Sequence, residues 1–440
     1  MTDNQKKVVT RMAPSPTGYF HIGSARTALF SYLFARKHGG SFLLRIEDTD
    51  KERSKRELET SIYDAMSWLG LSYDGEALRQ SERTAIYTSY LEKMIAEGTA
   101  YVSKETPVEP GGRTEVIRFK NPNRQVTFHD EIRGDITFDT TELKDFVIAK
   151  SLEEPLYHLA VVIDDHEMAV THVIRGEDHI SNTPRQILLQ EAIGAMRPIY
   201  AHLPLILAPD KSKMSKRKHG ETVSIGYYKE QGYLPEAMIN FLALIGWNPG
   251  TDREIFSLDE LVEGFSLERV QKSGAVFNVE KLNWLNREYI KKLPRERVSA
   301  EIEKVFPDAD KATLEKIEPL ILDRIATFAD IRGIKESGEF DFFFGQPGYE
   351  TSLLKTPEFL PETRQLLEKL EPKTWNLEPI KEALWEFATE KGRGKVLWPL
   401  RVALTGKEKS PDPFTVAALI GKEETLKRID HAIEIAQHTS

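Results

Sequence analysis

Residues 13–24 read APSPTGYFHIGS, and this stretch decides the expected fold. Its two prolines and two glycines predict a loop. The text of residues 7–10 before it is typical of a short buried strand, and residues 24–38 after it carry apolar side chains at helical spacing. Residues 42–46 read as a second strand and 55–69 as a second helix. Strand, glycine loop, helix and strand form the opening of a doubly wound nucleotide-binding sheet, so we expect an α/β fold.

The alternation of strands and helices ends near residue 101, where a sequence rich in turn-forming residues begins. We interpret residues 101–154, with β-prone stretches at 116–120 and 136–138, as an insert between two halves of the sheet. The first half takes residues 1–100. The second half takes residues 155–220, with strand-like text at 156–163, 169–174 and 205–207 and a helix at 183–193.

Helical periodicity dominates the remainder of the chain. A connecting region over 221–300 contains predicted helices at 235–245, 258–265 and 279–290. After Pro294 nearly all the periodic text is helical, which predicts an all-helical C-terminal domain over 301–440.

The composition excludes several classes of protein. No apolar run approaches the roughly 18–20 residues of a membrane span, so no membrane partner is expected. Residues 1–7 are polar and lack a signal-peptide core, so we expect a cytoplasmic location. The chain has no cysteine, which excludes disulfides, thiolate zinc sites and a cysteine nucleophile. Its 11 histidines lack the paired spacing of metal ligands, so no metal site is expected.

The net charge of −9 argues against a generic nucleic-acid binder. Local basic faces at residues 211–218, 287–297 and 391–401 still allow RNA binding. Any one such run, taken alone, is typical of a solvated surface.

A second motif changes that interpretation for residues 211–218, which read KSKMSKRK. Together and in this order, the two motifs resemble the ATP-handling signatures of class I aminoacyl-tRNA synthetases. The flanking text, TRM at 10–12 and RIEDTD at 45–50, narrows the resemblance to the glutamyl/glutaminyl subgroup. The chain resembles bacterial-type glutamyl-tRNA synthetases over nearly its whole length.

The resemblance implies ATP-dependent attachment of L-glutamate to tRNA, through glutamyl-adenylate and then transfer to the terminal adenosine. It implies a Rossmann-like catalytic domain whose insert at 101–154 clasps the acceptor end of tRNA. Residues 221–300 would contact the tRNA stem, and 301–440 would bind the anticodon. The cysteine-rich zinc loop that several relatives carry is absent from the insert. We expect a monomer.

The first motif suits ATP binding. Gly18 and Gly23 let the backbone approach a nucleotide, and a helix beginning at Ser24 offers N–H groups to phosphate. His21 can donate a hydrogen bond to a phosphate oxygen and is expected to be catalytic. The alternative is a strand–helix turn that His21 merely caps. The family motif has a second histidine where this chain has Ser24.

The second motif supplies cations for the β- and γ-phosphates as pyrophosphate leaves. Lys213 and Lys216 are the expected catalytic lysines, and the resemblance makes Lys216 the main ATP-binding lysine. Ser215 belongs to the same ATP-binding loop, and Arg217 stands where the family consensus has serine. We expect Mg²⁺ with the ATP, held mainly by phosphate oxygens.

The amino-acid pocket must bind two carboxylates and an ammonium group. Arginine forks suit carboxylates, and Arg11 and Arg175 match family positions. The resemblance assigns the substrate side-chain carboxylate to Arg175, which glutaminyl relatives lack, and the ammonium group to Glu47. Further expected pocket residues are Ser15, Tyr157 and His179, while Val161 replaces an asparagine of some relatives. The alternatives are an acid at a helix N-terminus for Glu47 and a structural histidine for His179.

Residues 398–406 resemble an anticodon-binding segment. Arg401 is the clearest anticodon candidate, and Arg324 aligns with an arginine that reads the third anticodon base. For both, a helix-surface salt bridge is the alternative.

Other functions remain as alternatives. A shorter paralogue that glutamylates a modified tRNA base lacks an anticodon domain, which the helical text of 301–440 argues against. A glutaminyl-tRNA synthetase is disfavoured by Arg175 and by the helical C-terminal text. A non-catalytic tRNA-binding relative would have lost His21 or Lys216. The sequence leaves open whether glutamine tRNA is also charged with glutamate.

Overall fold

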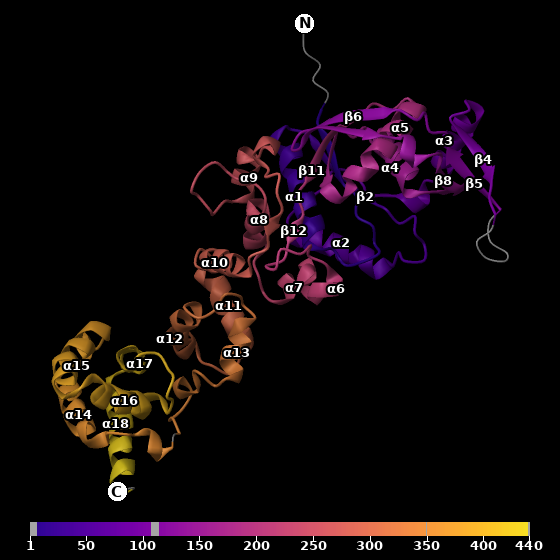
Figure 1. Ribbon diagram of the computed structural model, residues 1–440. Coiled ribbons are helices and arrows are strands. Elements are labelled where there is room, and N and C mark those ends of the chain that lie inside the picture. Colours follow the sequence, from indigo (N-terminus) through magenta and orange to yellow (C-terminus); the bar gives the residue numbers. More distant parts are fainter. Residues whose placement is uncertain (1–6, 107–113, 349, 439–440) are drawn as a thin grey trace. The chain divides into compact units, whose positions relative to one another are not determined.

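The computed structural model describes residues 7–106, 114–348 and 350–438, except the side chains of Lys216 and Thr351. The chain divides into two compact units, residues 1–289 and 290–440. Figure 1 shows both units and labels their helices and several of their strands. In the described residues, no helix has the length and apolar character needed to cross a membrane.

The opening of the first unit is the expected strand, helix and strand. Strand β1 (Val9–Met12) pairs in parallel with β2 (Ser41–Ile46), and α1 (Ile22–Lys37) makes the crossover between them. The turn after α1 requires glycine, because a Cβ at Gly40 would lie 2.3 Å from the Val8 carbonyl oxygen. The sheet then continues through α2 (Arg56–Trp68) to the short parallel strand β3 (Leu78–Arg79).

A second sheet continues the first one beyond β1. The Thr171 N–H, just before β10, donates to the Val9 carbonyl of β1 at 3.0 Å. The strand order of this second sheet is β10-β11-β6-β7, with β10 paired in parallel to β11 and β11 paired in parallel to β6. The bounds are β10 (His172–Gly176), β11 (Ile199–Leu203), β6 (Gln125–Asp130) and β7 (Gly134–Asp139).

The segment expected to be a separate insert contributes to this sheet as well as to one of its own. Strands β6 and β7 lie within residues 101–154, yet β6 is paired with β11 of the catalytic sheet. The other strands of the segment form an antiparallel sheet of order β4-β5-β8-β9. Their bounds are β4 (Ala100–Lys104), β5 (Glu115–Phe119), β8 (Phe146–Ser151) and β9 (Glu154–Pro155), and α3 (Thr84–Ala96) precedes them.

The expected strand over residues 156–163 is wrong, because this stretch forms helix α4 (Tyr157–Glu167). A short continuous apolar run fits either a buried strand or a buried helix, so its pattern alone does not decide. The residues from Leu159 to Ile163 are all buried, which explains why the run shows no polar face. The helix at 183–193 is confirmed as α5 (Thr183–Ile193), which packs against α4.

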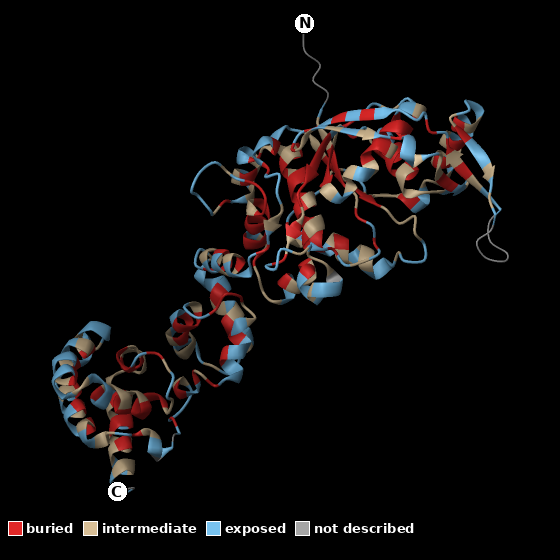
Figure 2. Cartoon of the chain, in the orientation of Figure 1, coloured by how far each residue is buried: buried red, intermediate tan, exposed pale blue. Residues whose placement is uncertain are grey.

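The rest of the first unit is mostly helical. Two short strands, β12 (Ile206–Leu207) and β13 (Ala275–Val276), pair in parallel. Buried residues gather along the central strands and the inner sides of the covering helices (Figure 2). The helices are α6 (Lys216–His219), α7 (Ile225–Glu230), α8 (Pro235–Leu244), α9 (Leu258–Gly264) and α10 (Val279–Ile290).

Helices are the only regular secondary structure in the described residues of the second unit, as expected. The expected boundary between residues 300 and 301 falls inside α11, whereas the compact unit begins at Ile290. Its helices are α11 (Arg295–Val305), α12 (Lys311–Leu322), α13 (Asp330–Glu336), α14 (Leu360–Glu368), α15 (Leu377–Lys391), α16 (Arg393–Thr405), α17 (Pro413–Ile420) and α18 (Lys422–His438).

Candidate active site

A cleft of about 1760 Å³ lies where β1, β2 and β10 end. This is the edge at which parallel sheets bind ligands, because the loops that follow the strands meet there. The cleft brings together residues that are far apart in the sequence. Its lining includes these expected site residues: Arg11, Ser15, Gly18, His21, Gly23, Ser24, Glu47, Tyr157, Arg175, His179, Lys213 and Ser215.

His21 lines the cleft and also caps α1. The Ser24 N–H donates to its Nδ1 at 3.2 Å, so the ring proton sits on Nε2, which lies 3.1 Å from the Ser24 hydroxyl. Burial lowers the pKa of His21, which keeps the ring neutral near pH 7. A Cβ at Gly23 would come within 3.0 Å of this ring, whereas a Cβ at Gly18 would meet nothing within 4 Å. Glycine at position 23 therefore makes room for the histidine.

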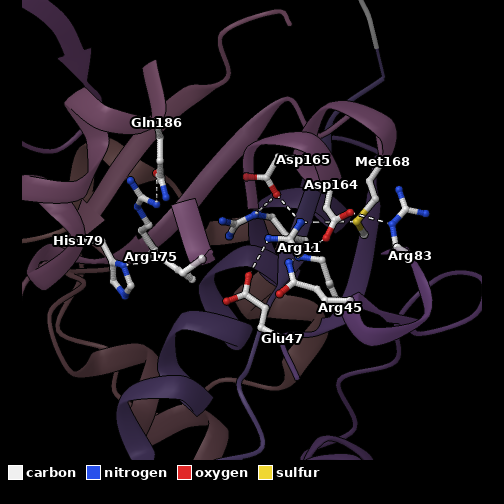
Figure 3. Close-up of polar contacts among 12 residues, drawn as sticks. Arg11, Arg45, Glu47, Arg83, Asp164, Asp165, Met168, Arg175, His179 and Gln186 are labelled. Atoms are coloured by element: carbon white, nitrogen blue, oxygen red, sulfur yellow. Dashed lines mark hydrogen bonds and ion pairs between the residues drawn. The ribbon is translucent and has the colours of Figure 1, made fainter. Parts of the chain in front are cut away.

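A buried set of charges lies beside the cleft, and two of its members, Arg11 and Glu47, line it (Figure 3 shows the set). Arg45 on β2 is fully buried, and its Nη1 donates to Asp165 Oδ1 at 2.6 Å while its Nη2 donates to Glu47 Oε1 at 2.9 Å. Arg11 Nε donates to the same Asp165 oxygen at 3.2 Å. Burial opposes the ionisation of Asp165, but the two arginines outweigh it and lower its pKa. Burial also raises the pKa of Glu47, and Arg45 only partly offsets that effect.

Asp164, the neighbour of Asp165 on α4, is fully buried and accepts from three side chains. Gln80 Nε2, Arg83 Nε and the Tyr87 hydroxyl donate to its carboxylate at 2.8, 2.7 and 2.8 Å. Because residues 156–163 were expected to form a strand, it was not predicted that Asp164 and Asp165 lie on a buried helix and accept these contacts. A signal was present, since two adjacent acids follow directly on a continuous apolar run, and buried aspartates are almost always paired.

Arg175 on β10 is buried and has only neutral hydrogen-bond partners. Its Nε, Nη1 and Nη2 donate to His202 Nε2 at 3.1 Å, Gln186 Oε1 at 2.7 Å and Thr183 Oγ1 at 2.8 Å (Figure 3 labels Arg175 and Gln186). Within the described part of the chain, no carboxylate forms an ion pair with it. Burial lowers its pKa. A buried cation without a counter-ion is costly, and a bound anion would compensate it.

Tyr157 and His179 lie together at the pocket. The Tyr157 hydroxyl is 3.1 Å from His179 Nδ1, and Asn182 Nδ2 lies 3.2 Å from the same nitrogen. Burial raises the pKa of Tyr157 to about 12 and lowers that of His179 to about 4, so both groups are neutral near pH 7. His179 thus lines the cleft and is also satisfied by protein partners.

The lysine motif meets the cleft through Lys213 and Ser215. Lys213 Nζ lies 3.3 Å from Asp178 Oδ2, and about half of each side chain is exposed. Lys216 begins α6, and its side chain lies outside the described residues. Arg217 is exposed and is not part of the cleft lining.

The two arginine candidates in the second unit differ. Arg324 Nε donates to Glu339 Oε1 at 2.5 Å, and its guanidinium lies 5.3 Å from the centre of the Phe340 ring, so it has the salt bridge of the alternative interpretation. Arg401 on α16 forms no ion pair with any described residue, and its buried Nε has no hydrogen-bond partner there. In the described part of the chain, no group of three or more histidine, aspartate or glutamate side chains is arranged to hold a metal.

Two family models match the chain and define its class. The model described as tRNA synthetases class I (E and Q), catalytic domain, matches residues 7–115 and 108–284, and the model described as anticodon binding domain matches 285–433. The fold and the cleft therefore belong to a class I aminoacyl-tRNA synthetase.

Individual relatives identify the family. The chain is 41% identical to a glutamate–tRNA ligase of Methylobacillus flagellatus, covering 97% of this chain and 99% of that protein. It is 42% identical to one of Nitrosospira multiformis, covering 97% and 98%. A crystal structure of a glutamate tRNA ligase from Elizabethkingia meningosepticum in complex with its amino acid gives a TM-score of 0.84 at 36% identity, covering 98% and 99%. This chain belongs to the glutamate–tRNA ligase family.

Proposed function

We propose that this protein attaches L-glutamate to tRNA in two ATP-dependent steps. A carboxylate oxygen of glutamate attacks the α-phosphorus of ATP, which forms glutamyl-adenylate and releases pyrophosphate. A hydroxyl of the terminal adenosine of tRNA then attacks the acyl carbon and releases AMP. The observation that carries the proposal is Arg175, a buried cation without a carboxylate partner in the described part of the cleft. An amino acid with a side-chain carboxylate supplies the missing anion, and the relatives named glutamate–tRNA ligase support that choice.

The amino acid occupies the part of the cleft between Arg175 and Glu47. Arg175 binds the side-chain carboxylate, and Glu47 accepts from the ammonium group. Arg11 offers its Nη groups to a substrate carboxylate, because the ion pair with Asp165 uses its Nε. Ser15, Tyr157 and His179 line the same part of the cleft and complete the pocket.

ATP occupies the part of the cleft beside the loop at residues 13–24. The neutral His21 ring carries its proton on Nε2 and donates it to a phosphate oxygen in place of the Ser24 hydroxyl. Gly18 in the loop, and Gly23 and Ser24 in the first turn of α1, present their backbone to phosphate.

Cations of the lysine motif stabilise the leaving pyrophosphate. Lys213 exchanges Asp178 for a phosphate group, which is possible because that ion pair is half exposed. Lys216, Ser215 and Arg217 complete this loop, with Lys216 as the main ATP-binding lysine. Mg²⁺ accompanies the ATP on phosphate oxygens, the ligands that this hard cation prefers.

The tRNA contacts follow the order of the chain. Residues 101–154 hold the acceptor end, 221–300 contact the stem, and 301–440 bind the anticodon, with Arg401 as the main reader and Arg324 as a secondary candidate. The unpaired Arg401 supports its assignment, because a guanidinium without a protein carboxylate is available to a base or a phosphate. The protein acts as a monomer.

Aminoacylation with labelled glutamate tests the proposal. Glutamate tRNA should be charged, and the same tRNA without its terminal adenosine should not be. Incorporation that survives this truncation would indicate glutamylation of a base and would overturn the proposal. Parallel reactions with glutamine tRNA and with labelled glutamine would define the range of tRNAs and of amino acids.

A further inference from the structure

Arg175, His202 and Asp130 lie in a row on three adjacent strands. Arg175 on β10 is the register partner of His202 on β11, and Asp130 ends β6, the strand on the other side of β11. His202 Nδ1 lies 2.6 Å from Asp130 Oδ2, and His202 Nε2 accepts from Arg175 Nε at 3.1 Å. The exposed fractions of Arg175, His202 and Asp130 are 6%, 0% and 0%. Neither His202 nor Asp130 lines the cleft.

The contacts define the tautomer of His202. A guanidinium Nε always carries its hydrogen, so His202 Nε2 must be the acceptor and the ring proton must sit on Nδ1. That proton is donated to Asp130, and the ring is neutral. Burial lowers the pKa of His202, which agrees with this neutral state.

Asp130 is held in place by backbone groups. Its Oδ1 accepts from the N–H groups of Ile132 at 3.0 Å and Arg133 at 2.9 Å, and its Oδ2 accepts from the His202 N–H at 3.0 Å. Burial opposes the ionisation of Asp130, but His202 and these N–H groups lower its pKa. The carboxylate therefore stays charged and fixed, and it can impose one tautomer on the ring.

A neutral imidazole between the carboxylate and the arginine has a specific consequence. A carboxylate in direct contact would orient Arg175 but would also neutralise it and compete with a substrate anion. The guanidinium has five N–H donors, and the three protein contacts use one each on Nε, Nη1 and Nη2. Arg175 is thus oriented by neutral acceptors, and two N–H groups and the full charge remain for a ligand.

We propose that His202 and Asp130 are positioning residues that set the specificity for glutamate, by holding Arg175 as an oriented cation without a protein counter-ion. The inference rests on the proposed role of Arg175 in binding the substrate side chain. Asp130 belongs to the segment at 101–154, so a strand of that segment contributes to the choice of the amino acid.

The first test compares two substitutions at position 202 in the full-length protein. In His202→Gln the amide oxygen can accept from Arg175 and the amide nitrogen can donate to Asp130, whereas His202→Leu has neither group. The glutamate KM should rise tenfold or more in His202→Leu and no more than about threefold in His202→Gln, with the ATP KM within twofold of the parent in both. The preference for glutamate over glutamine in kcat/KM should shrink in His202→Leu.

Two further variants complete the kinetic test. Asp130→Asn can donate an amide hydrogen to His202 Nδ1, which moves the ring proton to Nε2 and breaks the contact with Arg175, so the glutamate KM should rise as in His202→Leu. His172→Gln alters a partly buried histidine on the same strand as Arg175 but outside the cleft, and its glutamate KM should equal that of the parent. An unchanged glutamate KM in both His202→Leu and Asp130→Asn, in an active parent, overturns the inference.

The tautomer can be measured without any activity. Spectra of the ¹⁵N-histidine-labelled parent, with His202→Gln used to assign the resonance, should show a protonated Nδ1 and an unprotonated Nε2 for His202. A protonated Nε2 overturns the inference even if the variants fold poorly. Failure of the proposed function has a different signature, because the parent itself would then fail to charge tRNA with glutamate.

Discussion

Arg45 Nη1 lies 2.6 Å from Asp165 Oδ1, and the two side chains are 0% and 8% exposed. The arginine comes from β2 and the aspartate from α4, so the pair joins the first half of the sheet to a helix 120 positions away in the sequence. The same carboxylate oxygen accepts from Arg11 on β1. One acid thus holds the arginines of two neighbouring strands beside the cleft.

Loss of Arg45 should destabilise the first unit strongly. In Arg45→Met, Asp165 keeps only Arg11, and Glu47 loses its arginine, so buried carboxylates remain poorly compensated. We expect the free energy of unfolding to fall by about 3–5 kcal/mol, measured by urea denaturation followed by circular dichroism. Arg53→Met is the matched control, because its ion pair with Asp50 is exposed, and its midpoint should stay close to that of the parent. Similar midpoints for the two variants would contradict the prediction.

Substitution of Lys213 should act on catalysis rather than on binding of the amino acid. In Lys213→Met, the rate of ATP–pyrophosphate exchange should fall by about a hundredfold, or about 3 kcal/mol, because charge develops on the phosphates in the transition state. The glutamate KM should change little. Lys218→Met removes an exposed cation of the same motif and serves as the control. Exchange at the parental rate would remove Lys213 from the catalytic residues.

Arg175→Gln should reduce the preference for glutamate. The substrate carboxylate would be buried without its cation. The kcat/KM for glutamate should therefore fall by a factor equivalent to about 2–5 kcal/mol of lost transition-state stabilisation. The ratio of kcat/KM for glutamate to that for glutamine should shrink, since a site built for a charged partner penalises its neutral isostere. If the ratio stays constant, Arg175 is a structural residue and another group reads the side chain.

The two arginines of the helical unit should differ in their effect on tRNA. Arg401→Ala should raise the KM for glutamate tRNA by a factor equivalent to a loss of about 1–3 kcal/mol of binding free energy. The reason is that Arg401 has no ion pair with the described residues, so its guanidinium is not already occupied. Arg324→Ala should have a smaller effect on that KM, since Arg324 is engaged by Glu339 and Phe340. Pyrophosphate exchange at saturating tRNA should survive in both variants. If Arg324→Ala raises the tRNA KM more than Arg401→Ala does, Arg324 is the main anticodon-binding arginine and Arg401 the secondary one.

Partly buried histidines should make the folded state sensitive to acid. Burial lowers the pKa of His172 to about 4, whereas an unfolded histidine titrates near 6.5. Between about pH 6.5 and 4 the unfolded chain therefore binds a proton that the folded chain does not, and stability falls as the pH falls through this window. His158 and His179, also shifted to about 4, act in the same direction.

His172→Gln isolates one of these protons. Each such histidine contributes at most about 1.4 kcal/mol per pH unit to the slope of the unfolding free energy, and the variant should lose about one contribution. Urea denaturation of parent and variant at pH 7 and pH 5 measures the difference. If the unfolding free energies of parent and variant change equally between pH 7 and pH 5, the lowered pKa of His172 is contradicted.

Local signals in the sequence were sufficient for much of the fold. Glycines and prolines marked the loop at residues 13–24, apolar periodicity marked α1 and α5, and the long helical text marked the second unit. Two motifs about 190 positions apart also indicated residues that the cleft brings together, such as His21 and Lys213. These features are encoded by neighbouring residues, so they can be read from the chain itself.

Other features depend on contacts between distant segments. The apolar run at 159–163 lies within helix α4 and is buried along its whole length. Its own pattern permits a strand as well, so the choice depends on what packs around it. The pairing of β6 with β11, which brings Asp130 to His202 across 72 positions, has no local signal.

By itself, the sequence determined which chemical groups the protein carries and most of the local structure around them, since side-chain identity and short-range periodicity are properties of neighbouring residues. The tertiary structure alone decided how those groups are charged and oriented. Arg45 and Arg175 are both arginines on buried strands, yet one is compensated by Asp165 and Glu47 and the other has only neutral partners. That difference arises from burial and from which strand or helix lies alongside each residue, because a charge in a poorly solvated interior is governed by its nearest partners.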